Sequence, residues 1–285
     1  SIVYTVISGF GAKGPRSADP AYDGAVQAAA GMMANNGTAE SGPLRTGYMP
    51  VDLMTGMTAA YATTAALLRK QKTGKGQMVD VAMLDCAITL GSANFSRSEV
   101  DDIPDMLIGN QSITSAPTAS SFPTAEGSIL TAAIMPNHVE AFFDEIGLKE
   151  MLNDPKFATR EARIENKEIV RDAMIEALKS DTAENWEKRL APRGVPVAKI
   201  NSVKETARLE QLQYRNILTA VPAAKGMANG YKLPGAPFTN SEDGPEVMRP
   251  APVLGQHTVE ILEEIGIDKS TISTLAAEGV ICKAD

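Results

Sequence analysis

The feature that most constrains the fold is a long apolar helix joined by a glycine turn to a strand. Residues 52–72 read "DLMTGMTAAYATTAALLRKQK", without proline and with basic residues in the last turn, where cations favour the helix dipole. The turn "TGKGQ" and the strand-like run "MVDVAML" follow. Residues 1–7 also predict a strand, and one so apolar normally lies beside others in a buried parallel sheet.

The remaining pattern alternates short helices and strands around one irregular segment. Residues 22–33 predict an Ala-rich helix, and residues 98–121 are polar and broken by Pro, Gly, Ser and Thr, which indicates a linker between domains. After it come a strand in "GSILTAAI", a helix in "NHVEAFFDEIGL" and two helices within residues 160–191. The second of these begins at Thr182 and contains the only tryptophan, Trp186. "RGVPVAKINSVKETARLEQLQ" predicts a strand, a turn and a helix, and two short helices close the chain.

Composition bounds the class of protein. The chain has 285 residues, 44% of them hydrophobic, which is enough for one large domain or two smaller ones. The formal net charge is -8, and no basic stripe of the kind that binds nucleic acid is visible. Cys86 and Cys282 are too few and too isolated for a disulfide framework, so we expect a reducing compartment.

Targeting signals are not visible either. No basic-then-apolar leader opens the sequence, and no uninterrupted run of about 18 apolar residues predicts a membrane span. We therefore expect a cytoplasmic protein that does not bind membranes. The sequence starts without methionine inside a strand-like run, and we expect earlier residues of the same domain to be missing.

Asp52 stands at the start of the long helix. Aspartate is a favoured N-cap, because its oxygen accepts a hydrogen bond from an exposed backbone N–H, and local sequence favours this role. The unpaired N–H groups and the dipole at this end of a helix also favour negative charge. A charged carboxylate at the edge of an acyl pocket can act as a nucleophile, so a chemical role for Asp52 stays open.

Other chemical signals are weak. "SGFG" after the first strand is a tight turn or a place where the backbone approaches a phosphate or thioester, but it lacks the full G-x-G-x-x-G spacing. "TGKGQ" lies between a helix and a strand, the wrong order for a phosphate loop. His138 and His257 have no metal-ligand spacing around them, and no G-x-S-x-G motif is present. We predict no metal site and no serine hydrolase.

Taken together, several motifs resemble the class III CoA-transferase family, which includes formyl-CoA transferase and carnitine CoA-transferase. They are "YTVISGFG", "AYDGAVQAAAG", "VDLMTGMTAAYATTAALLRKQKTGKGQMVDVAMLD", "RGVPVAKINSVKE", "LPGAPFTNS" and "APVLGQHTVEILEEIG", in the family's order and over nearly the whole chain. The resemblance implies an α/β fold with an open parallel, Rossmann-like sheet in a large domain and an inserted smaller α+β domain. It also implies an interlocked homodimer.

The same resemblance implies a domain plan. Residues 1–110 would be the first part of the large CoA-binding domain, whose N-terminal portion is missing. Residues 111–214 would be the small domain with its linkers, and residues 215–285 would return to the large domain.

The resemblance also implies the chemistry. Asp52 falls on the family's catalytic aspartate, which forms a mixed anhydride with the acyl group and then a thioester with coenzyme A. The substrates would be an acyl-CoA and a carboxylic acid, and no metal or prosthetic group is needed. "SGFG" matches the loop that lines the CoA arm, and Met83 matches a methionine that packs near CoA, although its spacing alone favours a core residue. The predicted CoA site consists of Ser8, Gly9, Phe10, Gly11, Tyr22 and Met83.

Two alternatives stay open. Racemases of the same family use a His-Asp pattern where this chain has Tyr22 and Asp23, and tyrosine is a poor general base near neutral pH. A non-catalytic CoA-binding or assembly subunit is the other alternative, and the aspartate in "VDLMTG" argues against it because Ser or Asn would also cap a helix. The acyl donor and acceptor are not identified, and the small domain lacks the glycine run of formyl-CoA transferase.

Overall fold

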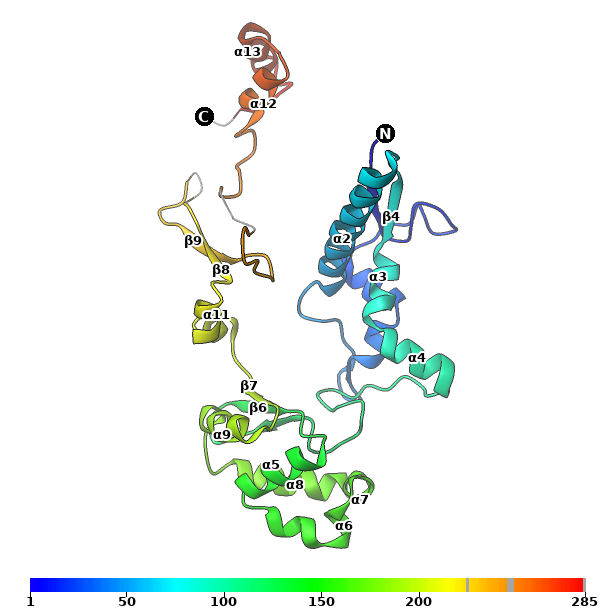
Figure 1. Ribbon diagram of the computed structural model, residues 1–285, viewed down its shortest axis with the longest axis vertical. Helices are drawn as coiled ribbons and strands as arrows, with labels where there is room; N and C mark the ends of the chain where they lie inside the picture. The colour runs from blue at the N-terminus through cyan, green and yellow to red at the C-terminus, as the bar shows by residue number, and fades with distance from the viewer. Residues whose placement is uncertain (224–225, 245–248, 284–285) are drawn as a thin grey trace. The chain divides into compact units, whose positions relative to one another are not determined.

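The computed structural model describes residues 1–223, 226–244 and 249–283. The chain forms two compact units, Ser1–Ile200 and Asn201–Asp285, which are described separately (Figure 1). The domain plan of residues 1–110, 111–214 and 215–285 stays a prediction. Within the described ranges, no helix has both the length and the apolar character needed to cross a bilayer.

The first unit begins with a parallel strand pair. β1 (Tyr4–Ser8) pairs with β4 (Met78–Ala82), with Tyr4 opposite Met78 and Ser8 opposite Ala82. Parallel neighbours need a long crossover, and α2 (Pro50–Thr73) belongs to it. The predicted strand, long helix and second strand are confirmed.

Polar contacts fix the direction of α2 beside the strands. The Ser1 hydroxyl donates to the Gly74 carbonyl (3.2 Å) and accepts from the Gly76 N–H (2.5 Å), so the helix ends beside the start of β1. Further along, the hydroxyls of Thr5 and Thr63 are 2.6 Å apart. The helix therefore runs antiparallel to both strands, as Figure 1 shows for α2 and β4.

This direction places the start of α2 at the carboxyl ends of the strands. Along the helix axis Asp52 lies ~16 Å from Thr63, whereas Ser8 lies ~10 Å from Thr5 along β1, from the standard rise per residue. Asp52 therefore lies beyond the level at which β1 ends. The carboxyl edge of a parallel sheet is the edge where α/β proteins bind their ligands.

Two predicted boundaries are wrong. The strand in "MVDVAML" ends at Ala82, and the next residue starts α3 (Met83–Leu90), which α4 (Ser92–Asp101) follows. The predicted linker therefore begins as a helix and becomes irregular only after Asp101. The Ala-rich helix is also shorter than predicted. It forms α1 (Asp23–Ala29), and a left-handed Gly31 (φ 76°) separates it from the 3₁₀ turn η1 (Met32–Asn35).

Residues 121–199 form an antiparallel sheet covered by helices. The strand order is β5 (Ser121–Pro123), β6 (Ser128–Thr131), β7 (Val197–Lys199). The helices are α5 (Pro136–Glu145), α6 (Pro155–Ala158), α7 (Arg160–Glu165), α8 (Lys167–Leu178) and α9 (Ala183–Leu190), with 3₁₀ turns η2 (Lys149–Asn153) and η3 (Ala191–Arg193). One core joins sheet and helices, and its fully buried members include Phe122, Ile129, Phe142, Phe143 and Met174. The predicted start of α9 is confirmed, because the Thr182 hydroxyl accepts from the Asn185 N–H.

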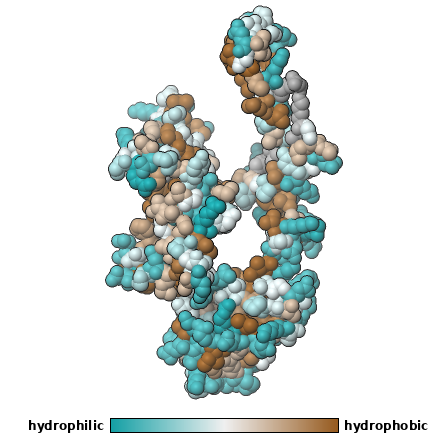
Figure 2. All heavy atoms as spheres, turned by 180° about the vertical axis from the view of Figure 1, so that it is seen from behind, coloured by the Kyte–Doolittle hydropathy of each residue, from teal (hydrophilic) through white to brown (hydrophobic). Residues whose placement is uncertain are grey.

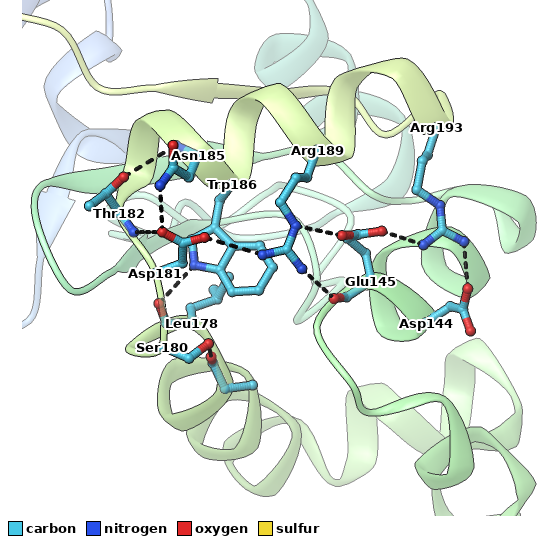
Figure 3. Close-up of polar contacts among 11 residues, drawn as sticks. Asp144, Glu145, Leu178, Ser180, Asp181, Thr182, Asn185, Trp186, Arg189 and Arg193 are labelled. Atoms are coloured by element: carbon cyan, nitrogen blue, oxygen red, sulfur yellow. Dashed lines mark hydrogen bonds and ion pairs between the residues drawn. The ribbon is translucent and has the colours of Figure 1, made fainter.

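A charged cluster ties α9 and η3 to the end of α5 (Figure 3). The Arg189 guanidinium stacks on the Trp186 ring and bonds Glu145 (2.7 Å), and Arg193 bonds Glu145 (2.6 Å) and Asp144 (2.5 Å). Hydrogen bonds from Arg193 are the main cause that holds the pKa of Asp144 and Glu145 below its ordinary value. The buried Trp186 indole N–H donates to the Leu178 carbonyl, so Trp186 stabilises this region through both its packing and its one polar group.

The second unit contains small elements. It holds α10 (Val203–Thr206), α11 (Glu210–Tyr214), the antiparallel pair β8 (Leu218–Val221) and β9 (Tyr231–Pro234), α12 (Thr258–Glu264) and α13 (Lys269–Ala277). Ser202 and Glu205 form a capping box at α10, and Asp268 caps α13. The predicted strand, turn and helix in the "RGVPVAKINSVKETARLEQLQ" passage are confirmed.

Candidate functional site

The two parallel strands bring predicted site residues to one edge. Ser8 ends β1 opposite Ala82, which ends β4, and each strand continues into a predicted site segment. The loop Gly9–Gly11 follows β1, and Met83 starts α3 directly after β4. The two segments are in contact, because the Gly9 carbonyl accepts from the Leu84 N–H at 3.0 Å.

Steric constraints explain the glycines of this loop. A Cβ at Gly9 would lie 2.2 Å from the Cβ of Ala21, so no larger residue fits without movement of one segment. Gly11 has a φ of +95°, a region in which residues with a Cβ are strained, and its N–H donates to the Ser8 hydroxyl oxygen at 3.0 Å. The Ser8–Gly11 segment is therefore a tight turn that carries backbone close to the start of the next segment, as one of the two interpretations of "SGFG" predicted.

Side chains around the turn hold it from outside. The Asp80 carboxylate, on β4, accepts from the Ala12 N–H at 3.0 Å. The Arg16 guanidinium lies 3.8 Å from the centroid of the Phe10 ring and is paired with Asp19 at 2.8 Å. One face of the Phe10 ring is thus covered by the Arg16 guanidinium of the same loop. The contact of Phe10 with CoA stays a prediction.

Asp52 is not the cap of α2. The helix begins at Pro50, the N-cap is Met49, and its side chain makes no capping hydrogen bond. Asp52 lies in the first turn and is exposed to solvent. Among the residues that the structure describes, no hydrogen bond or ion pair reaches its carboxylate. The side chain that local sequence assigned to capping is therefore not used as the cap of α2.

A different aspartate caps the helix. Asp23 Oδ2 accepts from the backbone N–H of Val51 (2.8 Å) and of Asp52 (3.1 Å), and Asp23 is only 6% exposed. Sequence reasoning treated Asp23 only as a neighbour of Tyr22. The residues that it caps lie 28 and 29 positions away, and no local motif marks a contact of that range.

A buried glutamine locks the capping carboxylate. Gln27, one turn after Asp23 on α1, donates to Asp23 Oδ1 (2.5 Å) and to the Thr46 hydroxyl (3.0 Å), and its Oε1 accepts from the Thr46 N–H (3.1 Å). The Thr46 hydroxyl in turn donates to the Tyr48 carbonyl (2.8 Å). The segment that leads into α2 and the cap of α2 therefore share one polar network, which we call the capping network: Asp23, Gln27, Thr46 and the N–H groups of Val51 and Asp52.

Packing connects this network to the strand edge. Val51, next to Asp52, is fully buried with Val26 and Ala87, and Met83 packs against the same cluster while remaining partly exposed. Met83 thus joins the core, as its spacing predicted, and still borders the site. Tyr22, the N-cap residue of α1, is 85% exposed and makes no capping hydrogen bond through its side chain.

A surface cavity of about 370 Å³ borders the capping network. Gln27 and Thr46 line it together with Asn94, Phe95 and Asp105, whereas Asp52 does not. The described residues contain no group of three His, Cys, Asp or Glu side chains that would hold a metal ion. Cys86 is buried and Cys282 is exposed, and both are free thiols.

The fold and this edge define an α/β protein with a free carboxylate at the carboxyl ends of parallel strands. The chain belongs to CoA-transferase family III, whose sequence profile matches residues 1–258. The resemblance seen in the motifs is confirmed.

Individual relatives agree with the family. An acyl-CoA transferase from Fusarium pseudograminearum is 30% identical over 98% of this chain and 61% of its own length. A succinate–glutarate CoA-transferase from Agrobacterium fabrum is 28% identical over 93% of this chain and 65% of its own length. The chain thus spans slightly less than two thirds of the length of these relatives.

Solved structures support the fold. The crystal structure of a CAIB/BAIF family protein from Brucella suis matches with a TM-score of 0.80 at 24% identity, over 93% of this chain and 68% of that one. The predicted α/β class is confirmed. The interlocked homodimer and the arrangement of a large and a small domain stay predictions.

Proposed function

We propose that the protein transfers coenzyme A from an acyl-CoA to a carboxylic acid, with Asp52 as the nucleophile. The observation that carries the proposal is the state of the Asp52 carboxylate. It is exposed in the first turn of α2, without a partner among the described residues, while Asp23 serves as the cap. A nucleophilic aspartate needs a fixed backbone and a carboxylate that makes no structural hydrogen bond or ion pair.

The proposed cycle conserves atoms and charge. An Asp52 oxygen attacks the thioester carbonyl and the C–S bond breaks. This step releases the CoA thiolate and forms a mixed anhydride between Asp52 and the acyl group. The thiolate attacks the aspartyl carbonyl, which releases the donor acid and leaves an aspartyl thioester. The acceptor carboxylate attacks that thioester and displaces the thiolate, which then attacks the acceptor carbonyl of the new anhydride. The products are the new acyl-CoA and the free Asp52 carboxylate.

The surrounding residues have supporting roles in this proposal. The Ser8–Gly11 turn and Met83 border the thioester arm of CoA, and Tyr22 contributes its exposed ring. Backbone N–H groups at the starts of α2 and α3 are the donors that would stabilise the tetrahedral oxyanions. The proposal requires no metal or prosthetic group, because each step exchanges one acyl bond for another.

We further propose a dicarboxylic acid as one substrate and a cytoplasmic homodimer as the working form. The Agrobacterium relative is named for succinate and glutarate, and the chain lacks the glycine run of formyl-CoA transferase.

The proposed homodimer is supported by an exposed apolar face on α2. Its side chains, spaced four apart and each about 60% exposed, are Leu53, Met57 and Tyr61. An apolar helix face of this kind is typical of a surface covered in an assembly.

The first experiment traps the intermediate. Purified protein is incubated with succinyl-CoA, acetyl-CoA or a branched acyl-CoA and hydroxylamine, and the peptides are analysed by mass spectrometry. We expect hydroxamate on Asp52, and we expect Asp52→Ala and Asp52→Asn to abolish both the label and transfer, by roughly a thousandfold or more, without loss of folded structure. Glutarate, succinate and oxalate serve as acceptors.

Two results would overturn the proposal. Unchanged turnover in Asp52→Ala would show that Asp52 is not the nucleophile. Incorporation of solvent deuterium at the α-carbon of the acyl-CoA, without transfer, would instead identify a racemase on the same scaffold.

A further inference from the structure

We propose that Asp23 is a positioning residue for the transfer reaction: it occupies the N–H groups at the start of α2 and so keeps the Asp52 carboxylate free for the acyl group. This inference rests on the proposed function, because it assigns Asp23 a role through Asp52. It is carried by the two hydrogen bonds from Val51 and Asp52 to a single oxygen, Asp23 Oδ2.

The start of a helix needs hydrogen-bond acceptors. The first N–H groups of a helix have no partner within the helix, and a nearby side-chain oxygen normally takes them. Asp52 lies in that first turn, where an acidic side chain can accept from backbone N–H groups of the same turn. In this structure the N–H groups of Val51 and Asp52 already donate to Asp23, so these two donors do not compete for the Asp52 carboxylate.

The Asp23 carboxylate, which accepts these hydrogen bonds, is held rigidly. Asp23 is 6% exposed and Gln27 is 1% exposed, so water does not replace their contacts freely. Gln27 uses its amide N–H groups on Asp23 and on the Thr46 hydroxyl, and its oxygen on the Thr46 N–H. Asp23 therefore holds both α2 and the segment before it, and the backbone of Asp52 is fixed from the buried side.

Loss of the Asp23 carboxylate would affect the reaction through Asp52. If Asp23 is truncated, the Val51 and Asp52 N–H groups lose their acceptor and become free to attract the Asp52 carboxylate. A nucleophile that must first leave such a bond, or that is displaced by about 1 Å, reacts more slowly without a matching loss of substrate binding. We expect Asp23→Ala to lower kcat by about 10- to 100-fold, with the KM for acyl-CoA within about threefold of wild type.

Conservative variants separate capping from bulk. Asp23→Asn keeps one oxygen for the helix but turns an amide NH₂ toward the Gln27 NH₂, so we expect an intermediate kcat. The double variant Asp23→Asn with Gln27→Glu restores the donor–acceptor pairing between positions 23 and 27, because the new carboxylate accepts from the asparagine amide and from the Thr46 N–H. The Thr46 hydroxyl, which donates to the Tyr48 carbonyl, loses its donor at position 27, so we expect the variant to recover part of the wild-type kcat and thermal stability.

A matched control removes a cap elsewhere. Thr182→Ala deletes the cap of α9, which lies in the 121–199 region. It should lower thermal stability to a similar extent as Asp23→Ala while kcat stays at the wild-type value. Hydrogen exchange of the peptide containing Val51 and Asp52 should speed up in Asp23→Ala and not in Thr182→Ala.

The outcomes distinguish this inference from the proposed function. If wild-type Asp52 takes no hydroxamate label, the proposed function fails and the role of Asp23 fails with it. If Asp52 is labelled but Asp23→Ala keeps wild-type kcat, the inference alone is overturned. It is also overturned if the double variant regains stability without kcat, since a charge at position 23 rather than a cap would then be required.

Discussion

Two regions of the first unit are stabilised in different ways. Residues 121–199 enclose one continuous core, in which Phe122, Phe142 and Phe143 are fully buried. Residues 1–101 contain only small buried clusters, one around Val51 and another around Val81. The difference indicates that apolar burial fixes the first region, whereas tight backbone contacts and the capping network fix the region that holds Asp52.

Surface composition repeats the contrast. The exposed α2 face formed by Leu53, Met57 and Tyr61 has no counterpart of that length on α5, which buries Val139, Phe142 and Phe143. Figure 2 shows hydrophobic residues reaching the surface on the face that it draws. A region with so much exposed apolar surface depends more on its polar contacts for stability.

The largest expected effect is in the core. Phe142 is fully buried and its ring meets Phe143 edge to face, with centroids 6.5 Å apart. Phe142→Ala should lower the free energy of unfolding by about 3–5 kcal/mol, measured by urea denaturation, because it removes burial and leaves a cavity.

The matched control for the core is an exposed apolar residue. Met57→Ala on α2 should change the free energy of unfolding by less than about 0.5 kcal/mol at dilutions where the protein is monomeric, because the chain itself leaves Met57 exposed. A cost close to that of Phe142→Ala under these conditions would show that Met57 is packed within the chain, and the contrast between the two regions would fail; a cost that appears only at high protein concentration would instead report the proposed homodimer.

The next effect is at the turn after β1. Gly9→Ala places a methyl group 2.2 Å from the Ala21 Cβ, and we expect a loss of about 1–3 kcal/mol from overpacking. The double variant Gly9→Ala with Ala21→Gly removes the collision and should recover most of the stability. No recovery would mean that the glycine is required by its backbone conformation and not by this contact.

Particular residues show how far the sequence predicted these regions. Thr182 and Trp186 were placed in a helix correctly, because the cap and the apolar spacing are both local signals. The parallel strand pair and α2 were also predicted, whereas the catalytic role that the family resemblance implies for Asp52 stays a prediction. The strand end at Ala82 was misplaced, since a short apolar run such as "VAMLDCAITL" fits a strand or a buried helix equally well.

The cap of α2 was missed for a different physical reason. Any aspartate near a helix start predicts a cap, but the helix begins two residues before Asp52, and the acceptor comes from α1. A shift of two or three residues in the helix start decides whether an aspartate is the cap or a first-turn residue, and local sequence does not fix the start that closely. The role of Asp23 depends on a tertiary contact and was visible only in the structure.

A smaller, opposite effect is expected one turn after Asp52. Gly56 lies inside α2, and a methyl group added there would meet no atom of another segment within 4 Å, so packing does not require glycine at this position. Gly56→Ala should raise the free energy of unfolding by about 0.5–1 kcal/mol through helix propensity. We also expect slower transfer, because the new methyl group lies on the same helix face as Asp52. A stabilised variant with unchanged kcat would show that the open space beside Asp52 is not used.

The smallest effect concerns the charged cluster around Arg193 and sharpens the comparison through pH. The bonds from Arg193 hold the pKa of Asp144 and Glu145 below the ordinary values of 3.8 and 4.5, so their stabilising contribution is present at neutral pH and is lost as pH falls through those lowered values. Arg193→Met should therefore lower the melting temperature slightly at pH 7, and the difference from wild type should shrink as the pH falls through the lowered pKa values and the two carboxyls become protonated. Lys188→Met, which breaks an exposed pair with Glu184, is the control and should show less pH dependence. A difference between Arg193→Met and wild type that persists in acid would mean that the arginine acts through its packing instead of its charge.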